Sequence, residues 1–139
     1  MVAFLAGAAL FSSSFAWAED IQLFNGKDFS NWHGRTTIDP KVYATKSDAE
    51  KAKWNDEIKT HWKIEGNEIV NDGKGAYLTT NEDYEDFDFE FEYKIVANCD
   101  SGIYLRGIPQ VQIWDPTSEA SKVHGAEKGS GGLWNNPAG

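Results

Sequence analysis

The strongest constraint on the fold is a stretch, residues 87–95, in which apolar and charged side chains alternate without a break. Every odd-numbered position carries Phe, Tyr or Ile, and every even-numbered position carries Asp, Glu or Lys. A strand directs successive side chains to opposite faces, whereas a helix would spread the aromatic rings around its circumference. We therefore expect a β-strand with its aromatic face in the core and its acidic face in water. Burial of each large side chain would contribute about 1.5–3 kcal/mol.

Further short segments are expected to form strands around this one. They are residues 21–24, 62–64, 68–70, 76–80, 103–106 and 110–114. Turn-forming residues separate them, and residues 65–67 predict a tight hairpin loop. Residues 48–54 predict a short surface helix in an insertion, because Ser47 and Glu50 have the spacing of a capping box. Short, closely spaced strands with little helix indicate an all-β fold, an antiparallel β-sandwich or jelly roll.

Residues 1–18 have the pattern of a signal peptide. Residues 1–17 carry no charge, and Ala16-Trp17-Ala18 fits the small-x-small pattern of a cleavage site. A membrane-spanning helix needs about 20 apolar residues, and Ser12-Ser13-Ser14 interrupts this run too early. We expect an exported protein, periplasmic or extracellular, with no stable membrane insertion; a buried N-terminal helix is the alternative.

The rest of the chain, residues 19–139, is long enough for one domain. Its last part, residues 129–139, is rich in Gly and Asn and contains no closing strand. Domains usually tie their last element into the core. We therefore expect residues 19–139 to form one domain that is incomplete at its C-terminus.

The net charge limits the classes of binding partner, and the cysteine content limits disulfide formation. The formal net charge of −9 disfavours nucleic acid and anionic lipid, whereas a neutral sugar is indifferent to it. Cys99 is the single cysteine, so the chain has no internal disulfide. We interpret Cys99 as a small buried residue rather than a nucleophile.

Two predicted strands carry polar side chains where a binding face is expected. Strand alternation places five residues together on one patch: Tyr104, Arg106, Gln110, Gln112 and Trp114. Amides and a guanidinium can bond the hydroxyls of a sugar, and an aromatic ring can pack on its C–H face. An ordinary solvated face of an antiparallel sheet is the alternative.

Three further residues could contribute functional side chains at the edge of this patch. Asp115 follows a strand end, where a carboxylate could act as acid, base or metal ligand, although Asp-Pro also starts ordinary turns. His124 lies in the next loop and could transfer a proton, although a lone loop histidine is usually solvated. Trp134 ends a Gly-rich loop that permits close approach of a ligand. The three histidines, His33, His61 and His124, show no metal-ligand spacing.

Taken in order, six motifs resemble those of the 3-keto-disaccharide hydrolase domain family. Residues 23–32 resemble its opening LFNGKDLxGW, and residues 62–70 resemble its W-x-V-x-x-G-x-I hairpin. The others are residues 84–93 (YxDFxxxxEYR), 98–106 (NSGIYLR), 111–115 (VQIxD) and 129–134 (GSGGLY/W). Each motif alone is weak, but their order across the chain is specific. Many members carry Glu where this chain has Gln110, which argues against an acid or base role for Gln110.

The resemblance implies a jelly roll of the concanavalin A-like lectin/glucanase type, bacterial export, and cleavage of glycosides oxidised at C3 (3-keto-glycosides). A ketone at C3 acidifies the hydrogen on C2, so a base can remove it and expel the substituent on C1, and water adds afterwards. Such a site needs a base, a donor to the enolate oxygen and an acid.

We expect Arg106 and Gln112 to bind the enolate or hydroxyl oxygens, and Asp115 and His124 to transfer protons. A divalent metal ion could replace the donor, and the sequence leaves this open. The alternative function is a non-catalytic carbohydrate-binding module on the same lectin-like fold.

Overall fold

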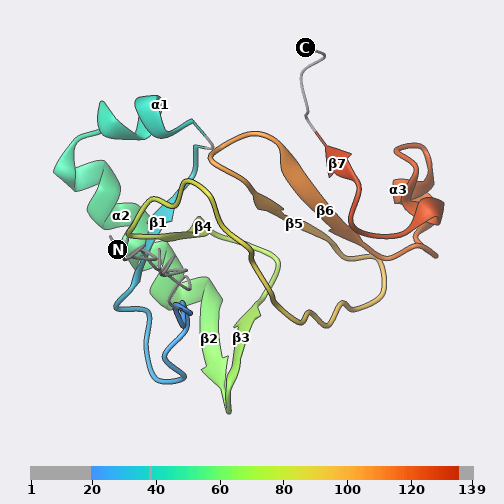
Figure 1. The fold of residues 1–139 in the computed structure, drawn as a ribbon, viewed down its shortest axis with the longest axis horizontal. Coiled ribbons are helices and arrows are strands. Elements are labelled where there is room, and N and C mark those ends of the chain that lie inside the picture. Colours follow the sequence, from blue (N-terminus) through green and yellow to red (C-terminus); the bar gives the residue numbers. More distant parts are fainter. Residues whose placement is uncertain (1–19, 38, 135–139) are drawn as a thin grey trace, which may run out of the picture.

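The computed structural model describes residues 20–37 and 39–134 (Figure 1). The predicted signal peptide, residues 1–18, lies outside the described residues. In chain order the elements are β1 (Trp32–Arg35), α1 (Pro40–Ala44), α2 (Asp48–His61), β2 (Trp62–Glu65), β3 (Glu68–Asn71), β4 (Tyr77–Thr80), β5 (Asp100–Tyr104), β6 (Gln110–Trp114), α3 (Glu119–Lys122), the 3-10 turn η1 (Ala126–Lys128) and β7 (Leu133–Trp134). No described helix is long and apolar enough to cross a membrane.

The strands form three small antiparallel sheets, β1–β4, β2–β3 and β5–β6–β7. The hairpin predicted around residues 65–67 is confirmed, since Glu65 lies opposite Glu68. Strands predicted at 76–80 and 103–106 are present as β4 and β5 with shifted ends, and the strand predicted at 110–114 is present as β6 with the same ends. The described residues thus form mainly antiparallel strands with few helices, which agrees with the predicted all-β sandwich class.

Helix α2 begins where the capping box predicts. The Ser47 hydroxyl accepts a hydrogen bond from the Glu50 backbone N–H over 3.3 Å, and the Glu50 carboxylate accepts one from the Ser47 N–H over 3.0 Å. The predicted end at residue 54 is wrong, because α2 continues to His61. The helix is also no surface appendage, since Ile58 is buried and α2 packs along β1. The capping signal is local and marks only where a helix starts.

A glycine lets α2 lie close to β1. A Cβ placed on Gly34 would come within 2.2 Å of the Trp54 carbonyl oxygen, a backbone atom. The Gly34 N–H donates to Oδ1 of Asn55 over 2.8 Å. The helix therefore approaches the strand at a distance that only glycine permits.

At the N-terminal end, the expected strand at residues 21–24 is wrong, and β1 forms instead. It pairs with β4, with Trp32 opposite Thr80 and Arg35 opposite Tyr77. Residues 21–24 pass beside β1 without entering a sheet, and the Trp32 Nε1–H donates to the Leu23 carbonyl over 3.2 Å. The segment is thus held by a side chain rather than by strand pairing.

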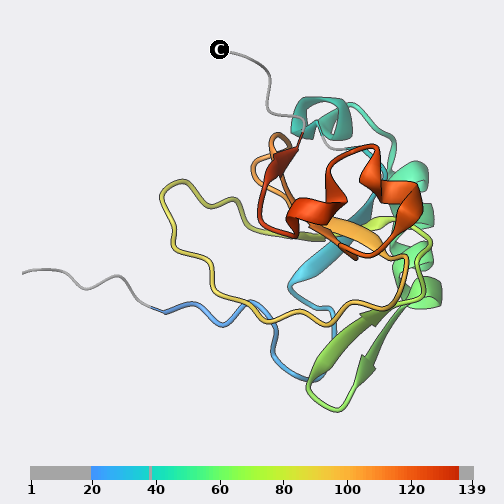
Figure 2. The same cartoon turned by 90° about the vertical axis from the view of Figure 1, so that its right-hand side faces the viewer.

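The expectation for residues 87–95 is only half right. The chain is extended there and the rings do lie on one side, since Phe89 and Phe91 stack at 5.1 Å and Phe91 and Tyr93 lie 6.1 Å apart. However, no described strand pairs with this segment, and it runs out from the body of the molecule (Figure 2, yellow). Its aromatic side chains are exposed rather than in the core. Alternation along a strand fixes which way the side chains point. Burial of those side chains also needs a second layer of residues packed on them, and the described residues form no such layer over this segment.

Candidate functional site

The β5–β6–β7 sheet carries the predicted polar face. In its register Tyr104 lies opposite Gln110, Gly102 opposite Gln112, and Asp100 opposite Trp114. Residues opposite one another on paired strands share a face. Four of the five predicted face residues, Tyr104, Gln110, Gln112 and Trp114, therefore lie together. On β7, Trp134 lies opposite Gln110 and joins the same face.

A carboxylate that was not expected from the sequence also lies on this face. Asp100 begins β5, and its Oδ1 accepts a hydrogen bond from Nε2 of Gln112 over 2.5 Å. Gln112 is buried, with 4% of its surface exposed, whereas Asp100 is exposed to solvent. The face therefore presents a carboxylate held by a buried amide. The even spacing of Asp100 from Tyr104 was the available signal, but the strand expected from the sequence begins only at residue 103 and leaves Asp100 outside it.

Gly102 makes room on the face for a second amide. A Cβ on Gly102 would lie 2.2 Å from Nε2 of Gln110, so the Gln110 side chain crosses β5 at this point. The ring of Tyr104 on this face packs beside a second aromatic ring, that of Tyr77 on β4, at 5.7 Å. The face thus brings two glutamine amides beside Asp100.

The Gly-rich loop lies against β6. The Gln112 N–H donates to the Gly132 carbonyl over 2.9 Å, and the Gly131 N–H donates back to the Gln112 carbonyl over 2.8 Å. The indole N–H of Trp114 donates to the Gly129 carbonyl over 2.9 Å. Because Trp114 is buried under this loop, with 7% exposed, it anchors the loop rather than offering a ring to a ligand.

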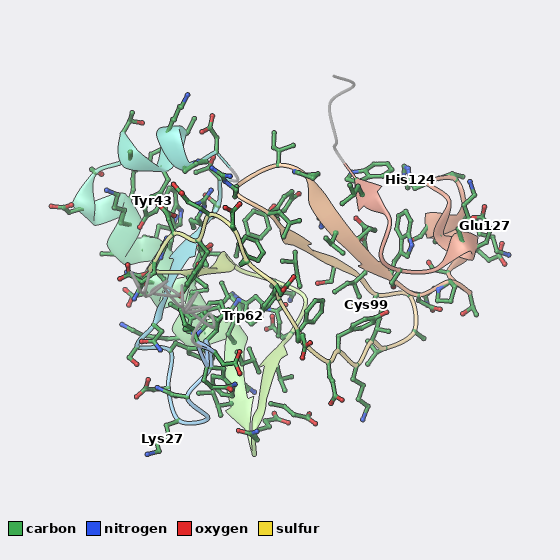
Figure 3. All side chains as sticks on the ribbon, viewed as in Figure 1. Lys27, Tyr43, Trp62, Cys99, His124 and Glu127 are labelled. Atoms are coloured by element: carbon green, nitrogen blue, oxygen red, sulfur yellow. The ribbon has the colours of Figure 1, made fainter. Side chains whose placement is uncertain are left out.

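The exposed aromatic edge of the site is formed by Trp134 and His124. Their rings lie 5.6 Å apart in an edge-to-face arrangement, and Trp134 is also 6.2 Å from Trp114. His124 is exposed and lies beside β7 (Figure 3). The structure therefore brings the loop histidine to the end of the polar face.

Arg106 lies beyond the strand that was expected to carry it. β5 ends at Tyr104, and Arg106 has a positive φ of 53° in the turn that closes on Pro109. Its side chain is exposed and makes no hydrogen bond or ion pair with any other described residue. The turn thus separates Arg106 from the alternation that holds Gln110 and Gln112.

Asp115 is tied into two turns. Its carboxylate accepts hydrogen bonds from the backbone N–H of Asn98 and from the N–H and hydroxyl of Thr117, each over 2.8 Å. These bonds, that of Asn98 first, lower the pKa of Asp115. A carboxylate with three donors is a poor proton acceptor, so the geometry favours a structural role for Asp115 over the predicted proton transfer.

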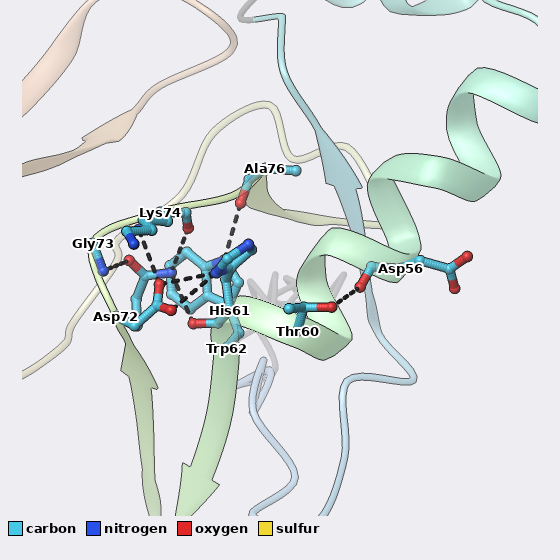
Figure 4. Close-up of polar contacts among 9 residues, drawn as sticks. Asp56, Thr60, His61, Trp62, Asp72, Gly73, Lys74 and Ala76 are labelled. Atoms are coloured by element: carbon cyan, nitrogen blue, oxygen red, sulfur yellow. Dashed lines mark hydrogen bonds and ion pairs between the residues drawn. The ribbon is translucent and has the colours of Figure 1, made fainter.

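A second polar cluster lies where α2 meets β2 (Figure 4). Nδ1 of His61 contacts both carboxylate oxygens of Asp72, at 2.9 and 3.2 Å, and this bond lowers the pKa of Asp72. The Asn71 amide donates to the His61 carbonyl over 3.2 Å, and the Trp62 Nε1–H donates to that of Ala76 over 2.9 Å. These contacts join the end of the helix to the loop after β3.

The third histidine, His33, is partly enclosed. Its Nδ1 contacts Oδ1 of Asn81 at 3.1 Å, and its ring lies 5.0 Å from that of Tyr43. Burial lowers the pKa of His33. Within the described ranges, no three His, Cys, Asp or Glu side chains gather to hold a metal ion.

A cavity of about 260 Å³ lies away from the polar face. It is lined by residues of the N-terminal segment, of the turn before β1, and of the loop after β4: Ile21, Gln22, Leu23, Asn31, Asn81, Glu82 and Tyr84. It shares no residue with the β5–β6–β7 face. We base the candidate site on the face, because that is where amides, a carboxylate and a histidine converge.

Comparisons with known proteins give one result. The family model described as a 3-keto-alpha-glucoside-1,2-lyase-like domain matches residues 19–138. Curated proteins and solved structures gave no match. The family match agrees with the resemblance drawn from the six motifs and relates the chain to carbohydrate. Since it covers nearly the whole sequence, the chain belongs to the 3-keto-alpha-glucoside-1,2-lyase-like domain family.

Proposed function

We propose that this protein cleaves 3-keto-glycosides by elimination across C1 and C2 of the oxidised sugar, and that the β5–β6–β7 face is its active site. The family description supports the substrate class. The contact between Gln112 and Asp100 carries the assignment of the site, because it holds an exposed carboxylate beside amide donors.

In this proposal Asp100 takes the proton from C2, and the electron pair moves toward the ketone oxygen on C3. The side-chain amide of Gln110 donates a hydrogen bond to that developing negative charge. The electron pair then forms the C1–C2 double bond, the C1–O bond breaks, and the leaving oxygen takes a proton. Water later adds across the double bond to give the free 3-keto sugar.

His124 is the proposed donor to the leaving oxygen, and Trp134 the ring that packs on the sugar. Both lie at the exposed end of the face, 5.6 Å apart. Arg106 on the neighbouring turn is assigned to substrate binding alone. We assign no step of the reaction to Asp115, since its carboxylate oxygens already accept three hydrogen bonds.

A carbohydrate-binding module is the second candidate. The Trp134 ring remains 39% exposed next to the Gln110 strand position, which is what a sugar-binding surface without catalysis would also offer. Such a module would bind oxidised and unoxidised sugars and leave both intact.

The test compares an aryl 3-keto-α-glucoside with its unoxidised parent, using the 139-residue chain. Release of the phenol from the oxidised substrate alone supports the proposal. In D₂O, elimination followed by hydration puts deuterium on C2 of the product faster than the exchange measured without enzyme. Release without that deuterium would point to direct hydrolysis, and binding without release would point to the module.

Export is part of the same proposal, with residues 1–18 as the signal peptide. It is supported by the uncharged apolar run and by Ala16-Trp17-Ala18. Mass and N-terminal sequence of the mature protein test it, and a start at or near Glu19 is expected. A mature chain that keeps residues 1–18 would contradict it.

A further inference from the structure

Gly102 lies at the centre of β5, on the strand that carries one side of the polar face. Strand alternation puts Asp100 and Tyr104 on the same face, two residues before and two residues after it. These neighbours carry a carboxylate and a phenol, whereas Gly102 leaves a gap between them. Glycine inside a strand weakens the strand, and it often marks a place where another group approaches the backbone closely.

The Gln110 side chain fills this gap. Gln110 lies on β6 opposite Tyr104, two positions along the register from the pair of Gly102 and Gln112. A Cβ on Gly102 would lie 2.2 Å from Nε2 of Gln110 and 2.7 Å from both its Cδ and its Cγ. The outer part of the Gln110 side chain, and not only its terminal nitrogen, therefore rests on the bare Cα of Gly102.

No hydrogen bond holds the Gln110 amide at this place. Among residues 20–37 and 39–134 the Gln110 side chain has no hydrogen-bond partner, and its polar atoms are not buried. The neighbouring amide differs, because Nε2 of Gln112 donates to Asp100 over 2.5 Å. The shape of the surface at Gly102 thus sets the position of the Gln110 amide and leaves its N–H groups for a ligand.

We propose that Gly102 is a positioning residue of the active site, which places the Gln110 amide where it donates to the ketone oxygen of the substrate. The inference rests on the proposed function, in which Gln110 donates to the negative charge that develops on that oxygen. Alternate residues of a strand lie about 7 Å apart, so the amide over Gly102 and the carboxylate of Asp100 can reach neighbouring atoms of one sugar ring. A donor that is already in place stabilises developing charge without reorganisation during the reaction.

A methyl group at position 102 should displace the amide without unfolding the chain. The atoms that it would meet belong to the flexible end of the Gln110 side chain, which can rotate aside. The φ of Gly102 is not positive, so alanine can adopt the same backbone conformation. Gly34 differs in this respect, because its Cβ would meet backbone atoms of α2. Gly102→Ala should therefore remove a donor from the site and keep the fold.

The kinetic test measures turnover of an aryl 3-keto-α-glucoside by the 139-residue chain. Gly102→Ala should lower kcat by about 10²–10³-fold, the usual effect of losing one donor to a developing negative charge. KM should stay nearly unchanged, because the lost hydrogen bond is made mainly in the transition state. Gln110→Ala should give a similar loss, and the double variant Gly102→Ala/Gln110→Ala should lose no more than Gln110→Ala alone. Ser101→Thr, which adds a methyl group on the other face of β5, is the control and should keep the activity.

A second readout does not depend on catalysis. In NMR spectra of the wild type, the Gln110 side-chain amide protons should show a nuclear Overhauser contact to the Cα hydrogens of Gly102, and the Gln110→Ala spectrum identifies that amide by its loss. In Gly102→Ala the amide signal should shift and lose its contact with residue 102, whereas Ser101→Thr should keep both. The urea midpoint of Gly102→Ala should stay close to that of the wild type.

Full activity of Gly102→Ala would overturn the proposal. A loss in the double variant equal to the product of the two single losses would also overturn it, because Gly102 would then act independently of Gln110. So would a Gly102→Ala chain that does not fold, since the methyl group would then meet more than one flexible side chain. If the wild type cleaves no 3-keto-glycoside, the proposed function fails instead. The NMR contact then decides by itself whether Gly102 places the amide, and its absence from the wild type would contradict that placement.

Discussion

The Nε2 atom of Gln112 lies 2.5 Å from Oδ1 of Asp100, diagonally across the β5–β6 pair. A buried amide thereby fixes an exposed carboxylate at one end of the polar sheet face. The two carboxylates at this end of the sheet, Asp100 and Asp115, therefore have different roles. The Asp115 carboxylate already accepts hydrogen bonds from backbone and hydroxyl donors of its own turns.

Asp100→Asn is expected to reduce turnover of an aryl 3-keto-α-glucoside by about 10²–10⁴-fold, the usual contribution of a general base. The amide is isosteric but cannot accept the C2 proton. Steady-state kinetics check this, with Asp115→Asn as the matched control that should retain most of the activity. Comparable losses in both variants would contradict the assignment of Asp100.

Asp115 is expected to stabilise the folded chain in a pH-dependent way. Hydrogen bonds lower its pKa in the folded state, so its contribution is complete above the unfolded value near 3.9 and is lost as pH falls through the lower folded value. Urea unfolding of wild type and Asp115→Asn from pH 7 to pH 2 measures this. The difference between them should shrink at the acid end, and a constant difference would show that charge is not involved.

Phe89→Ala is expected to change the free energy of unfolding by less than about 1 kcal/mol, because Phe89 is exposed in the extended segment between β4 and β5. From alternation alone, the same change would be expected to cost about 3–5 kcal/mol, as in a core. Ile113→Ala on β6 is the buried counterpart and should cost about 2–5 kcal/mol. Chemical denaturation of the two variants gives the comparison, and a large loss for Phe89→Ala would place the ring in a core.

Gly34→Ala is expected to destabilise the protein by about 1–3 kcal/mol or more, as overpacking does. Its Cβ would meet the Trp54 carbonyl oxygen at 2.2 Å, and backbone atoms of α2 cannot turn aside as a side chain can. Gly132→Ala is the control, since nothing lies within 4 Å of its Cβ and its φ is not positive. Thermal and urea unfolding should show the loss in the first variant alone.

Much of the candidate face followed from the sequence. Alternation placed Gln110, Gln112 and Trp114 on one side of β6, and the structure confirms it because side-chain direction in a strand depends only on neighbouring residues. The Ser47 cap was predictable for the same reason. Trp134 could be brought near the face through the Gly-rich loop, although its hydrogen bonds to β6 could not be specified.

Other features depended on residues far apart in the chain. The hydrogen bond from Gln112 holds Asp100 on the polar face. The hydrogen bond from the backbone N–H of Asn98 ties Asp115 into a turn instead. The close approach of α2 to β1 depends on Gly34, which lies about twenty residues before Trp54 in the chain. The sequence by itself determined which way the side chains of residues 87–95 point, and only the tertiary structure decided whether they are buried. Direction is a property of the local backbone, whereas burial requires a partner brought close by the whole fold.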